Sequence, residues 1–198
     1  MISVKHKIIF IHIPKCAGQS IENIFLKDLG LNWQDRYPLL LRPKKAKEKC
    51  PERLAHLYAE EYFKFGFIPK EKYDKFFKFT IIRNPIDRVL SEINYRRIPK
   101  KKSTNSNGFE SVEEYISKVS KLNKFSDLQR HISPQVKFLY DSETNELLVD
   151  KIISFDELNY EVPKILKKKL RVFLEVPKIN ASKSKLWLKE ELTSEDFS

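Results

Sequence analysis

The sequence predicts an α/β protein in which helices cover both faces of a central parallel sheet, giving three layers. Three short apolar runs, at 8–13, 76–82 and 147–155, are interpreted as buried strands. Segments with helical spacing follow them, and strands that alternate with helices are typical of a parallel sheet. At 198 residues, the chain is expected to form one domain spanning residues 1–198.

The first strand leads directly into a helix. Pro14 ends the strand, because proline cannot donate a hydrogen bond to a β-ladder. Gly18 allows a close approach to the backbone at the start of the helix. The helix itself is indicated by apolar residues at helical spacing, namely Ile21, Ile24, Phe25 and Leu29.

Where a strand leads directly into a helix, several free backbone N–H groups at the helix N-terminus point towards the same place. These donors and the helix dipole attract an anion, most often a phosphate. Lys15 adds a full positive charge at the same place. We therefore predict an anion site here, with an ordinary strand–turn–helix and a surface lysine as the alternative. Its residues would be Lys15, Cys16, Ala17, Gly18, Gln19 and Ser20.

The loop is not a Walker A motif, in which a lysine and a Ser/Thr follow the second glycine. Here Lys15 precedes Gly18, and we identify no aspartate at a strand end that would hold a metal. The loop is therefore expected to bind a phosphate group without a metal ion.

A second anion site is predicted after the strand at 76–82. Arg83 ends this strand, Asn84 is a favourable helix N-cap, and Pro85 suits the first helical position. Arg83 could bind a phosphate bidentately while Ser91 donates its hydroxyl; alternatively, Arg83 pairs with Asp87. Ligands of open α/β sheets bind beyond the carboxyl ends of the strands. Both sites should therefore face one crevice and suit a ligand with two separated phosphates.

The remaining segments are assigned more briefly. We predict an irregular basic stretch at 33–51 and a helix at 52–65 that carries His56. Residues 100–108 are expected to form a surface loop, and the tail from residue 180 is polar and weakly patterned. Further helices are predicted at 112–121, 125–131 and 157–169.

The composition restricts the partners and the compartment. The net charge of +11 favours polyanionic ligands such as nucleotides or acidic glycans. Neither of the two cysteines has a spacing that suits zinc, and no apolar run approaches the length of a membrane span. The N-terminus lacks a signal peptide, so we expect a cytoplasmic protein, or a lumenal one whose N-terminal anchor has been removed.

Two motifs together resemble a known family. H-I-P-K-C-A-G-Q-S at 12–20 and F-T-I-I-R-N-P-I-D-R-V-L-S at 79–91 are similar to motifs of sulfotransferases that use 3′-phosphoadenosine 5′-phosphosulfate (PAPS). The similarity is to the branch with the heparan and chondroitin enzymes, including heparan sulfate 2-O-sulfotransferases. The first motif usually reads H-I-P-K-T-A-G-S/T-S, so Cys16 and Gln19 depart from it. Weaker similarities lie at 131–139, 153–158 and 176–180.

The resemblance implies a fold like that of the P-loop nucleotide kinases, with PAPS as donor and no metal. Lys15 would contact the phosphosulfate and neutralise charge on the leaving phosphate. The rest of the first loop would hold the 5′-phosphate, while Arg83 and Ser91 would hold the 3′-phosphate. Family members often continue with a further C-terminal helix, so this chain is either shortened or lacks that helix.

The acceptor must lose a proton as its hydroxyl attacks, which calls for a base. His56 matches the position of a family histidine between the two anion motifs, so we predict His56 as the base. His131 is the second candidate, and His12 is expected to be structural. Glu60 and Glu61 are weaker candidates, because ordinary carboxyl groups have pKa values near 4.

We expect the acceptor to be a glycan rather than nucleic acid, although no acceptor motif is present. Two alternatives remain open at this stage. One is a nucleotide-dependent kinase or NTPase, which magnesium-dependent ATP hydrolysis would favour. The other is a non-catalytic module that binds polyanions, which the aromatic and basic residues around Tyr95 allow.

Overall fold

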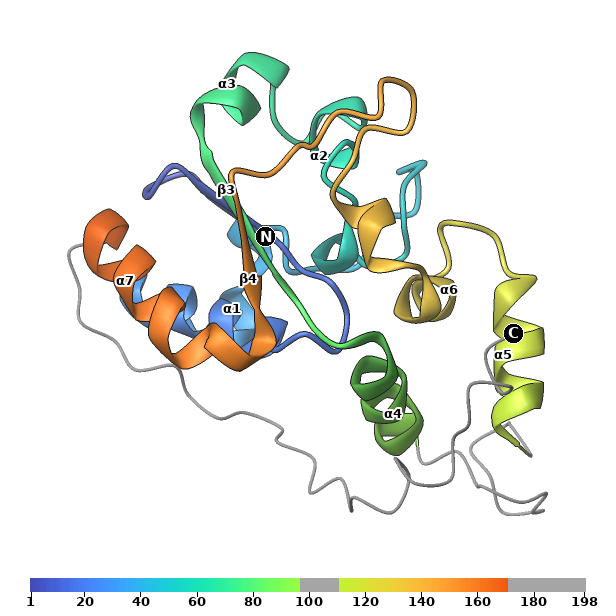
Figure 1. The fold of residues 1–198 in the computed structure, drawn as a ribbon. Helices are drawn as coiled ribbons and strands as arrows, with labels where there is room; N and C mark the ends of the chain where they lie inside the picture. The colour runs from blue at the N-terminus through green and yellow to red at the C-terminus, as the bar shows by residue number, and fades with distance from the viewer. Residues whose placement is uncertain (97–110, 171–198) are drawn as a thin grey trace.

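The computed structural model describes residues 1–96 and 111–170. Its sheet has four strands in the order β1-β2-β3-β4 (Figure 1). The strands are β1 (Ile2–Ser3), β2 (Ile8–Ile11), β3 (Phe77–Ile82) and β4 (Lys151–Ser154). Strands β2, β3 and β4 are parallel, as predicted. The short edge strand β1 was not predicted and pairs antiparallel with β2, so the sheet is mixed.

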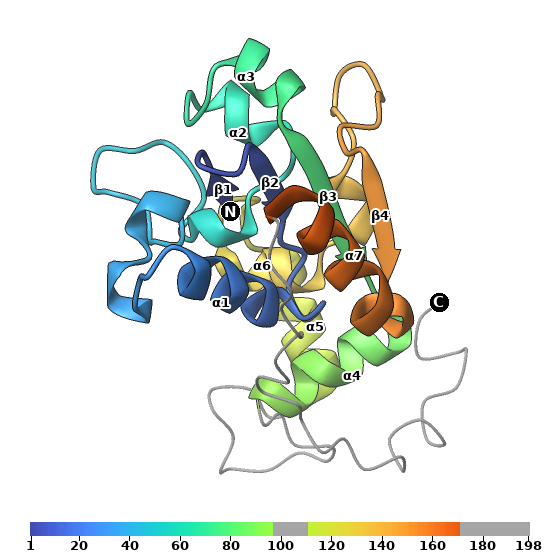
Figure 2. The ribbon, with the colours of Figure 1, turned by 90° about the vertical axis from the view of Figure 1, so that its left-hand side faces the viewer.

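Helices lie on both faces of this sheet, which gives the predicted three layers. Helices α1 and α7 cover one face, while α2 and α6 lie on the other (Figures 1 and 2). Helix α4 leaves the carboxyl end of β3, and α5 lies beside it. The helices are α1 (Gly18–Asp28), α2 (Glu61–Lys64), α3 (Lys70–Lys75), α4 (Pro85–Arg96), α5 (Val112–Ser120), α6 (Asp127–Ile132) and α7 (Leu158–Leu170).

The core forms because β2 is buried along its whole length and β3 over all but its first and last residues. Ile9, Phe10 and Phe79 are almost fully buried, and the rings of Phe10 and Phe79 lie 5.0 Å apart. Burial of such side chains contributes about 1.5–3 kcal/mol each. Thr80 is polar but donates its hydroxyl to the carbonyl of Ile11 at 2.8 Å, so it is accommodated in this core.

The predicted helix at 52–65 is wrong. The segment forms a 3₁₀ turn, η3 (Leu54–His56), then an extended piece, and only then the short helix α2. The physical reason is tertiary: the N–H of Ala59 donates to the carbonyl of Phe138 at 2.9 Å, which draws the chain out of a helical path. The apolar residues of this segment have helical spacing, but they are buried by a loop that packs against the core and not by a helix.

The other predicted boundaries shift by a few residues. The strand expected at 147–155 is limited to β4, because Tyr140 and Leu147 form a separate bridge before it. The stretch at 33–51 is irregular as predicted, with 3₁₀ turns η1 (Trp33–Asp35) and η2 (Tyr37–Leu39). The loop at 100–108 and the tail from residue 180 lie outside the described residues. Within the described part of the chain, no helix is both long and apolar enough to cross a bilayer.

Candidate active site

The loop between β2 and α1 turns sharply where the anion site was predicted. Lys15 and Ala17 both adopt the left-handed conformation, with φ of 68° and 60°. Sharp turns of this kind direct successive N–H groups towards one side, where an anion can bind. Cys16, Gly18 and Ser20 are buried, whereas Lys15, Ala17 and Gln19 are partly exposed. The side chains of the partly exposed residues are therefore the ones accessible to a ligand.

Cys16 is turned into the protein and does not offer its side chain to this site. Its Sγ donates to Oε1 of Gln135 at 3.5 Å, and burial raises the pKa of the thiol to about 11. Gln135 in turn accepts from the N–H of Arg83 and donates to its carbonyl, at 2.9 and 2.7 Å. Gln135 thereby joins the two predicted anion sites, which the sequence analysis had not foreseen.

Arg83 lies directly beside the first loop. Its Nη1 donates to the carbonyl of Lys15 at 3.3 Å, and its guanidinium stacks on Phe155, 4.4 Å from the ring centroid. Burial lowers the pKa of Lys15, and the positive charges of Arg96 and Arg83 lower it further, while Glu92 opposes them. The charges of Lys15, Arg83 and Arg96 are thus close enough to repel one another, and an anion beside them would relieve this repulsion.

Helix α4 begins as predicted. Oδ1 of Asn84 accepts from the N–H groups of Ile86 and Asp87 at 3.0 and 3.3 Å, so Asn84 is the N-cap and Pro85 is the first helical residue. Ser91 lies further along this helix and is partly buried. The structure therefore places Arg83 beside the first loop, just before α4, and Ser91 within α4.

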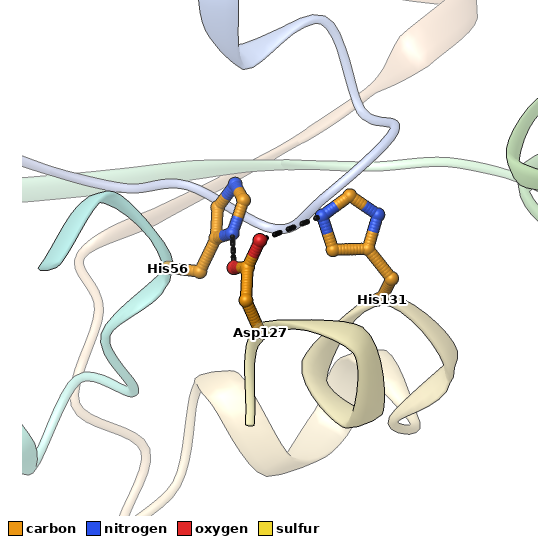
Figure 3. Close-up of side chains that lie close together, drawn as sticks. All are labelled: His56, Asp127 and His131. Carbon is orange, nitrogen blue, oxygen red and sulfur yellow. Dashed lines mark hydrogen bonds and ion pairs between the residues drawn. The ribbon is translucent and has the colours of Figure 1, made fainter. Parts of the chain in front are cut away.

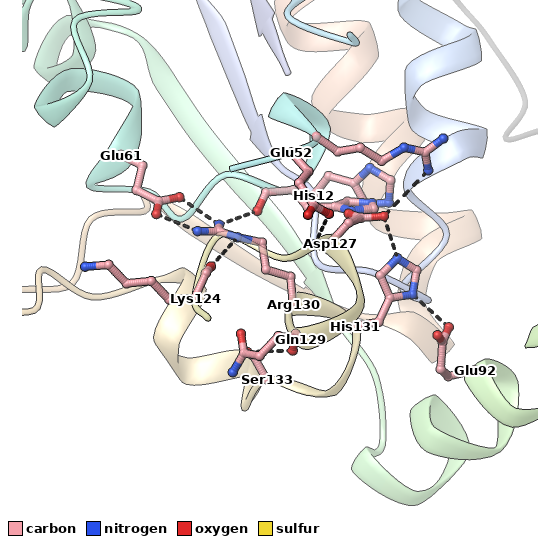
Figure 4. A network of polar contacts seen from close by, with 12 residues as sticks. His12, Glu52, Glu61, Glu92, Lys124, Asp127, Gln129, Arg130, His131 and Ser133 are labelled. Atoms are coloured by element: carbon pink, nitrogen blue, oxygen red, sulfur yellow. Dashed lines mark hydrogen bonds and ion pairs between the residues drawn. The ribbon is translucent and has the colours of Figure 1, made fainter. Parts of the chain in front are cut away.

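Three histidines form a row, which begins at His12 next to Gly18 of the first loop. The rings of His12 and His56 lie 4.8 Å apart and those of His56 and His131 lie 5.0 Å apart. Each histidine has its own carboxylate at Nδ1: Glu22 for His12 at 2.6 Å, Asp127 for His56 at 2.6 Å (Figure 3), and Glu92 for His131 at 2.7 Å (Figure 4). A carboxylate at Nδ1 fixes the orientation and tautomer of an imidazole.

His56 has the protonation state that a base needs. Burial lowers its pKa to about 3, and this outweighs the hydrogen bond to Asp127 that raises it. Burial raises the pKa of Asp127, but the hydrogen bond from His56 and nearby positive charge hold it well below its usual range. The imidazole is thus neutral with its hydrogen on Nδ1, and Nε2, which points away from Asp127, carries the lone pair (Figure 3).

These features agree with a comparison against known families. The model of the sulfotransferase family matches residues 1–192. The chain belongs to the sulfotransferase family. It is therefore a transferase of sulfuryl groups, and members of this family generally use PAPS as the donor. Among curated proteins and among solved structures, no match was found.

Gly18 has a packing role in this sulfotransferase that was not predicted. A Cβ atom on Gly18 would overlap the imidazole of His12, so the glycine is required by a protein side chain. His12 cannot easily move, because Nδ1 is bonded to Glu22 and the ring stacks on Phe10 at 5.8 Å. The prediction that His12 is structural agrees with this packing, in which His12 separates the anion loop from His56.

Replacing Gly18 with alanine is expected to lower the free energy of unfolding by about 1–3 kcal/mol, because the added methyl group overpacks a filled site. Urea unfolding would measure this. Gly30 is a matched control of the same residue type, although its positive φ of 63° adds backbone strain. Nothing lies within 4 Å of a Cβ on Gly30, so Gly30→Ala should cost only about 1 kcal/mol. A Gly18→Ala variant as stable as the wild type would contradict the packing argument.

Arg88 was missed as a structural residue. Its buried guanidinium donates to the carbonyls of Pro14, Ser133 and His131 at 2.9, 2.8 and 2.9 Å. Arg88 therefore ties α4 to the start of the anion loop and to the end of α6. The sequence signal for Arg88 was its place in the spacing R-N-P-x-x-R of the second motif. A charged residue in such a motif is more readily interpreted as a ligand-binding residue than as one that stabilises the fold.

Arg130 holds the turn that carries His56 (Figure 4). It forms a buried bidentate ion pair with Glu61 at 2.7 and 2.6 Å and donates to the carbonyl of His56 at 2.7 Å. Its guanidinium also stacks on Tyr58, 4.1 Å from the ring centroid. Because Glu61 is committed to Arg130, it is not available as a base.

Proposed function

We propose that this sulfotransferase transfers a sulfuryl group from PAPS to a hydroxyl group of a carbohydrate acceptor, with His56 as base. The observation that supports this most is the placement of a neutral, carboxylate-oriented imidazole next to a loop on which Lys15 and Arg83 converge. A nucleotide with two phosphate groups and a hydroxyl nucleophile are the partners that this arrangement suits.

Lys15 and the partly exposed positions of the first loop would bind the 5′-phosphosulfate, with Gly18 and Ser20 contributing through the helix N-terminus. Arg83 and Ser91 would bind the 3′-phosphate. The positive charges of Lys15, Arg83 and Arg96 act on one another, which fits a ligand of high negative charge beside Lys15 and Arg83. PAPS supplies the activated sulfuryl group, and these side chains bind and orient it.

In the transfer step, the acceptor oxygen forms a bond to sulfur while the bond from sulfur to the 5′-phosphate oxygen breaks. His56 accepts the hydroxyl proton at Nε2, and Asp127 stabilises the resulting imidazolium through Nδ1. Lys15 stabilises the charge that develops on the leaving phosphate. His131 remains the second candidate for the base.

The acceptor proposal rests on a basic segment beside His56. The N–H of Lys44 donates to the carbonyl of Glu52 at 2.9 Å, and the N–H of Leu54 donates to the carbonyl of Arg42 at 3.0 Å. The segment at 42–49 therefore lies next to residues 52–54, which directly precede His56. Exposed cations on it, Lys44, Lys45, Lys47 and Lys49, would attract an acidic glycan of the heparan or chondroitin type. Transfer to such glycans and to neutral ones should be compared directly.

We also propose a reducing compartment such as the cytoplasm. Cys16 and Cys50 are buried free thiols, and neither is paired with the other.

Calorimetry with 3′-phosphoadenosine 5′-phosphate tests the donor site. The Arg83→Ala variant is expected to bind this nucleotide about 10–100-fold more weakly, because a charge-assisted hydrogen bond to the 3′-phosphate is lost. Binding of adenosine 5′-phosphate, which lacks that phosphate, should change little. Lys70→Ala, on an exposed residue of α3, is the control. Equal weakening of both nucleotides would mean that Arg83 does not contact the 3′-phosphate.

Calorimetry also distinguishes the sulfotransferase from the two alternative functions, a kinase or NTPase and a non-catalytic module that binds polyanions. Preference for ATP with magnesium would favour a kinase or NTPase. Binding that ignores both nucleotides but increases with the length of a polyanion would favour a non-catalytic module.

A further inference from the structure

One nitrogen of His131 has an unusual environment. Nδ1 donates to Glu92, a carboxylate that also accepts from Arg96 and Tyr115, so the lone pair of the imidazole is on Nε2. Nε2 is buried and has no hydrogen-bond partner in the part of the chain that the structure describes. The side chain of His131 is only 7% exposed. A buried polar atom without a partner is costly and calls for an explanation.

This nitrogen faces a carboxylate oxygen. Oδ2 of Asp127 lies 3.8 Å from Nε2 of His131 (Figure 3). Two atoms that both carry lone pairs repel each other at this separation unless a positive centre lies between them. Asp127 and His131 are four residues apart on α6, which places them on one helix face. The other oxygen of Asp127 is bonded to Nδ1 of His56.

We propose that His56, Asp127 and His131 bind a divalent transition-metal ion, with Zn²⁺ as the best fit. One ligand atom from each residue lies within 4.8 Å of the others. Zinc bonds to nitrogen and oxygen are about 2.0–2.2 Å, so ligand atoms around a tetrahedral zinc lie about 3.4 Å apart. The contact between Asp127 and His131 must shorten slightly, and the contact between His56 and Asp127 must widen as its bridging hydrogen leaves.

The donor set selects the metal. Two imidazoles and one carboxylate suit zinc, whereas magnesium and calcium prefer oxygen ligands alone. Glu92 at Nδ1 of His131 is the outer carboxylate that commonly orients a zinc-binding histidine. Cys/His spacing along the sequence does not reveal this site, because one ligand is a carboxylate and His56 is distant in the chain.

The fourth position would be taken by water. The side chain of Asp127 is 18% exposed, so solvent reaches the cluster from that side. The guanidinium of Arg53 lies there, 3.9 Å from Oδ2, and must turn away when a cation binds. Arg53 is free to do so because its side chain is 60% exposed.

Metal binding would also block the base, a consequence that rests on the proposed function. If His56 binds the ion through Nδ1, the hydrogen of that nitrogen moves to Nε2 and the neutral ring keeps one hydrogen. Nε2 then no longer has a lone pair that could take the proton from the hydroxyl group of the acceptor. Zinc should therefore inhibit transfer reversibly, and a chelator should restore it.

Titration of the full, chelator-treated chain with ZnCl₂ in a calorimeter tests the site without donor or acceptor. We expect one ion per chain, and binding at least about 100-fold weaker in His131→Ala and in the isosteric Asp127→Asn. His6→Ala is the matched control, because His6 also pairs with a carboxylate, Asp28, but lies outside the cluster. Visible absorption of the Co²⁺ form would report nitrogen and oxygen ligands in a tetrahedral site. Circular dichroism should verify that each variant is folded.

The absence of zinc binding to the wild type, or equal binding by the folded His131→Ala variant, would overturn the proposal. A proton on Nε2 that is shared with Asp127 would then explain the geometry. The donor site is tested separately by nucleotide calorimetry without metal. If the chain binds zinc and transfer continues, the metal site stands and His56 is not the base.

Discussion

Replacing His56 with alanine is expected to lower the rate of sulfuryl transfer by about 10²–10⁴-fold while nucleotide binding persists. The physical reason is that Nε2 of His56 carries a lone pair, while the hydrogen bond from Nδ1 to Asp127 fixes the orientation of the ring. Initial rates with PAPS and a glycan that the wild type sulfates would measure transfer, and calorimetry would measure nucleotide binding. Near-normal turnover would remove His56 as the base.

His131→Ala is the matched comparison, because His131 also has a carboxylate at Nδ1 and its ring is next to that of His56 in the row. A larger loss in His131→Ala than in His56→Ala would transfer the role of base to His131. Asp127→Asn should fall between the wild type and His56→Ala, because an amide orients His56 but stabilises its imidazolium poorly.

The pH profile gives an independent measure of the same base. A base must be unprotonated, so activity is lost as the pH falls through its pKa. The pKa of His56 is lowered to about 3, so kcat/KM should stay nearly constant from pH 8 to about pH 5. A base with an ordinary histidine pKa near 6.5 would lose about 30-fold over the same range. A decline centred near pH 6.5 would contradict the buried, neutral state of His56.

Replacing Arg130 with methionine is expected to lower the free energy of unfolding by about 3–5 kcal/mol. The side chain of Arg130 is fully buried, and its loss would leave the Glu61 carboxylate without its counter-ion in the interior. The carbonyl of His56 would also lose a donor at 2.7 Å. Urea unfolding of the variant, followed by circular dichroism, would measure the change.

Lys70→Met is the control for this prediction. Lys70 and Asp74 also form an ion pair, but their side chains are 48% and 54% exposed, so the loss should be below about 1 kcal/mol. Adding Glu61→Leu to Arg130→Met should recover part of the stability, because the unpaired charge is removed. If Arg130→Met costs no more than Lys70→Met, the buried pair does not stabilise the fold as argued.

Several parts of the site could be predicted from short stretches of sequence. The apolar runs identified β2 and β3, and Asn84 with Pro85 marked the start of α4. The proximity of the Lys15 loop and Arg83 followed from the rule that parallel strands end at one edge. In each case the deciding interactions are local, or they are dictated by the sheet itself.

The region around His56 could not be predicted in the same way. Its apolar residues have helical spacing, yet the hydrogen bond from Ala59 to Phe138 keeps the segment extended. The contact of Cys16 with Gln135 could not be predicted either, because nothing near Cys16 in sequence reveals that Gln135 lies against its sulfur. Both outcomes depend on residues far away in the chain.

The sequence by itself determined the family, the strand–loop–helix units and the positions of Lys15 and Arg83 at the ends of β2 and β3, because these depend on periodicity, capping and motifs within about a dozen residues. Only the tertiary structure decided which carboxylate each histidine receives. Asp127 reaches His56 across 71 positions and Glu92 reaches His131 across 39. Any of the chain's 27 acidic residues could have been a partner by composition alone, so the choice is made when the core packs and leaves each buried imidazole one acceptor within reach.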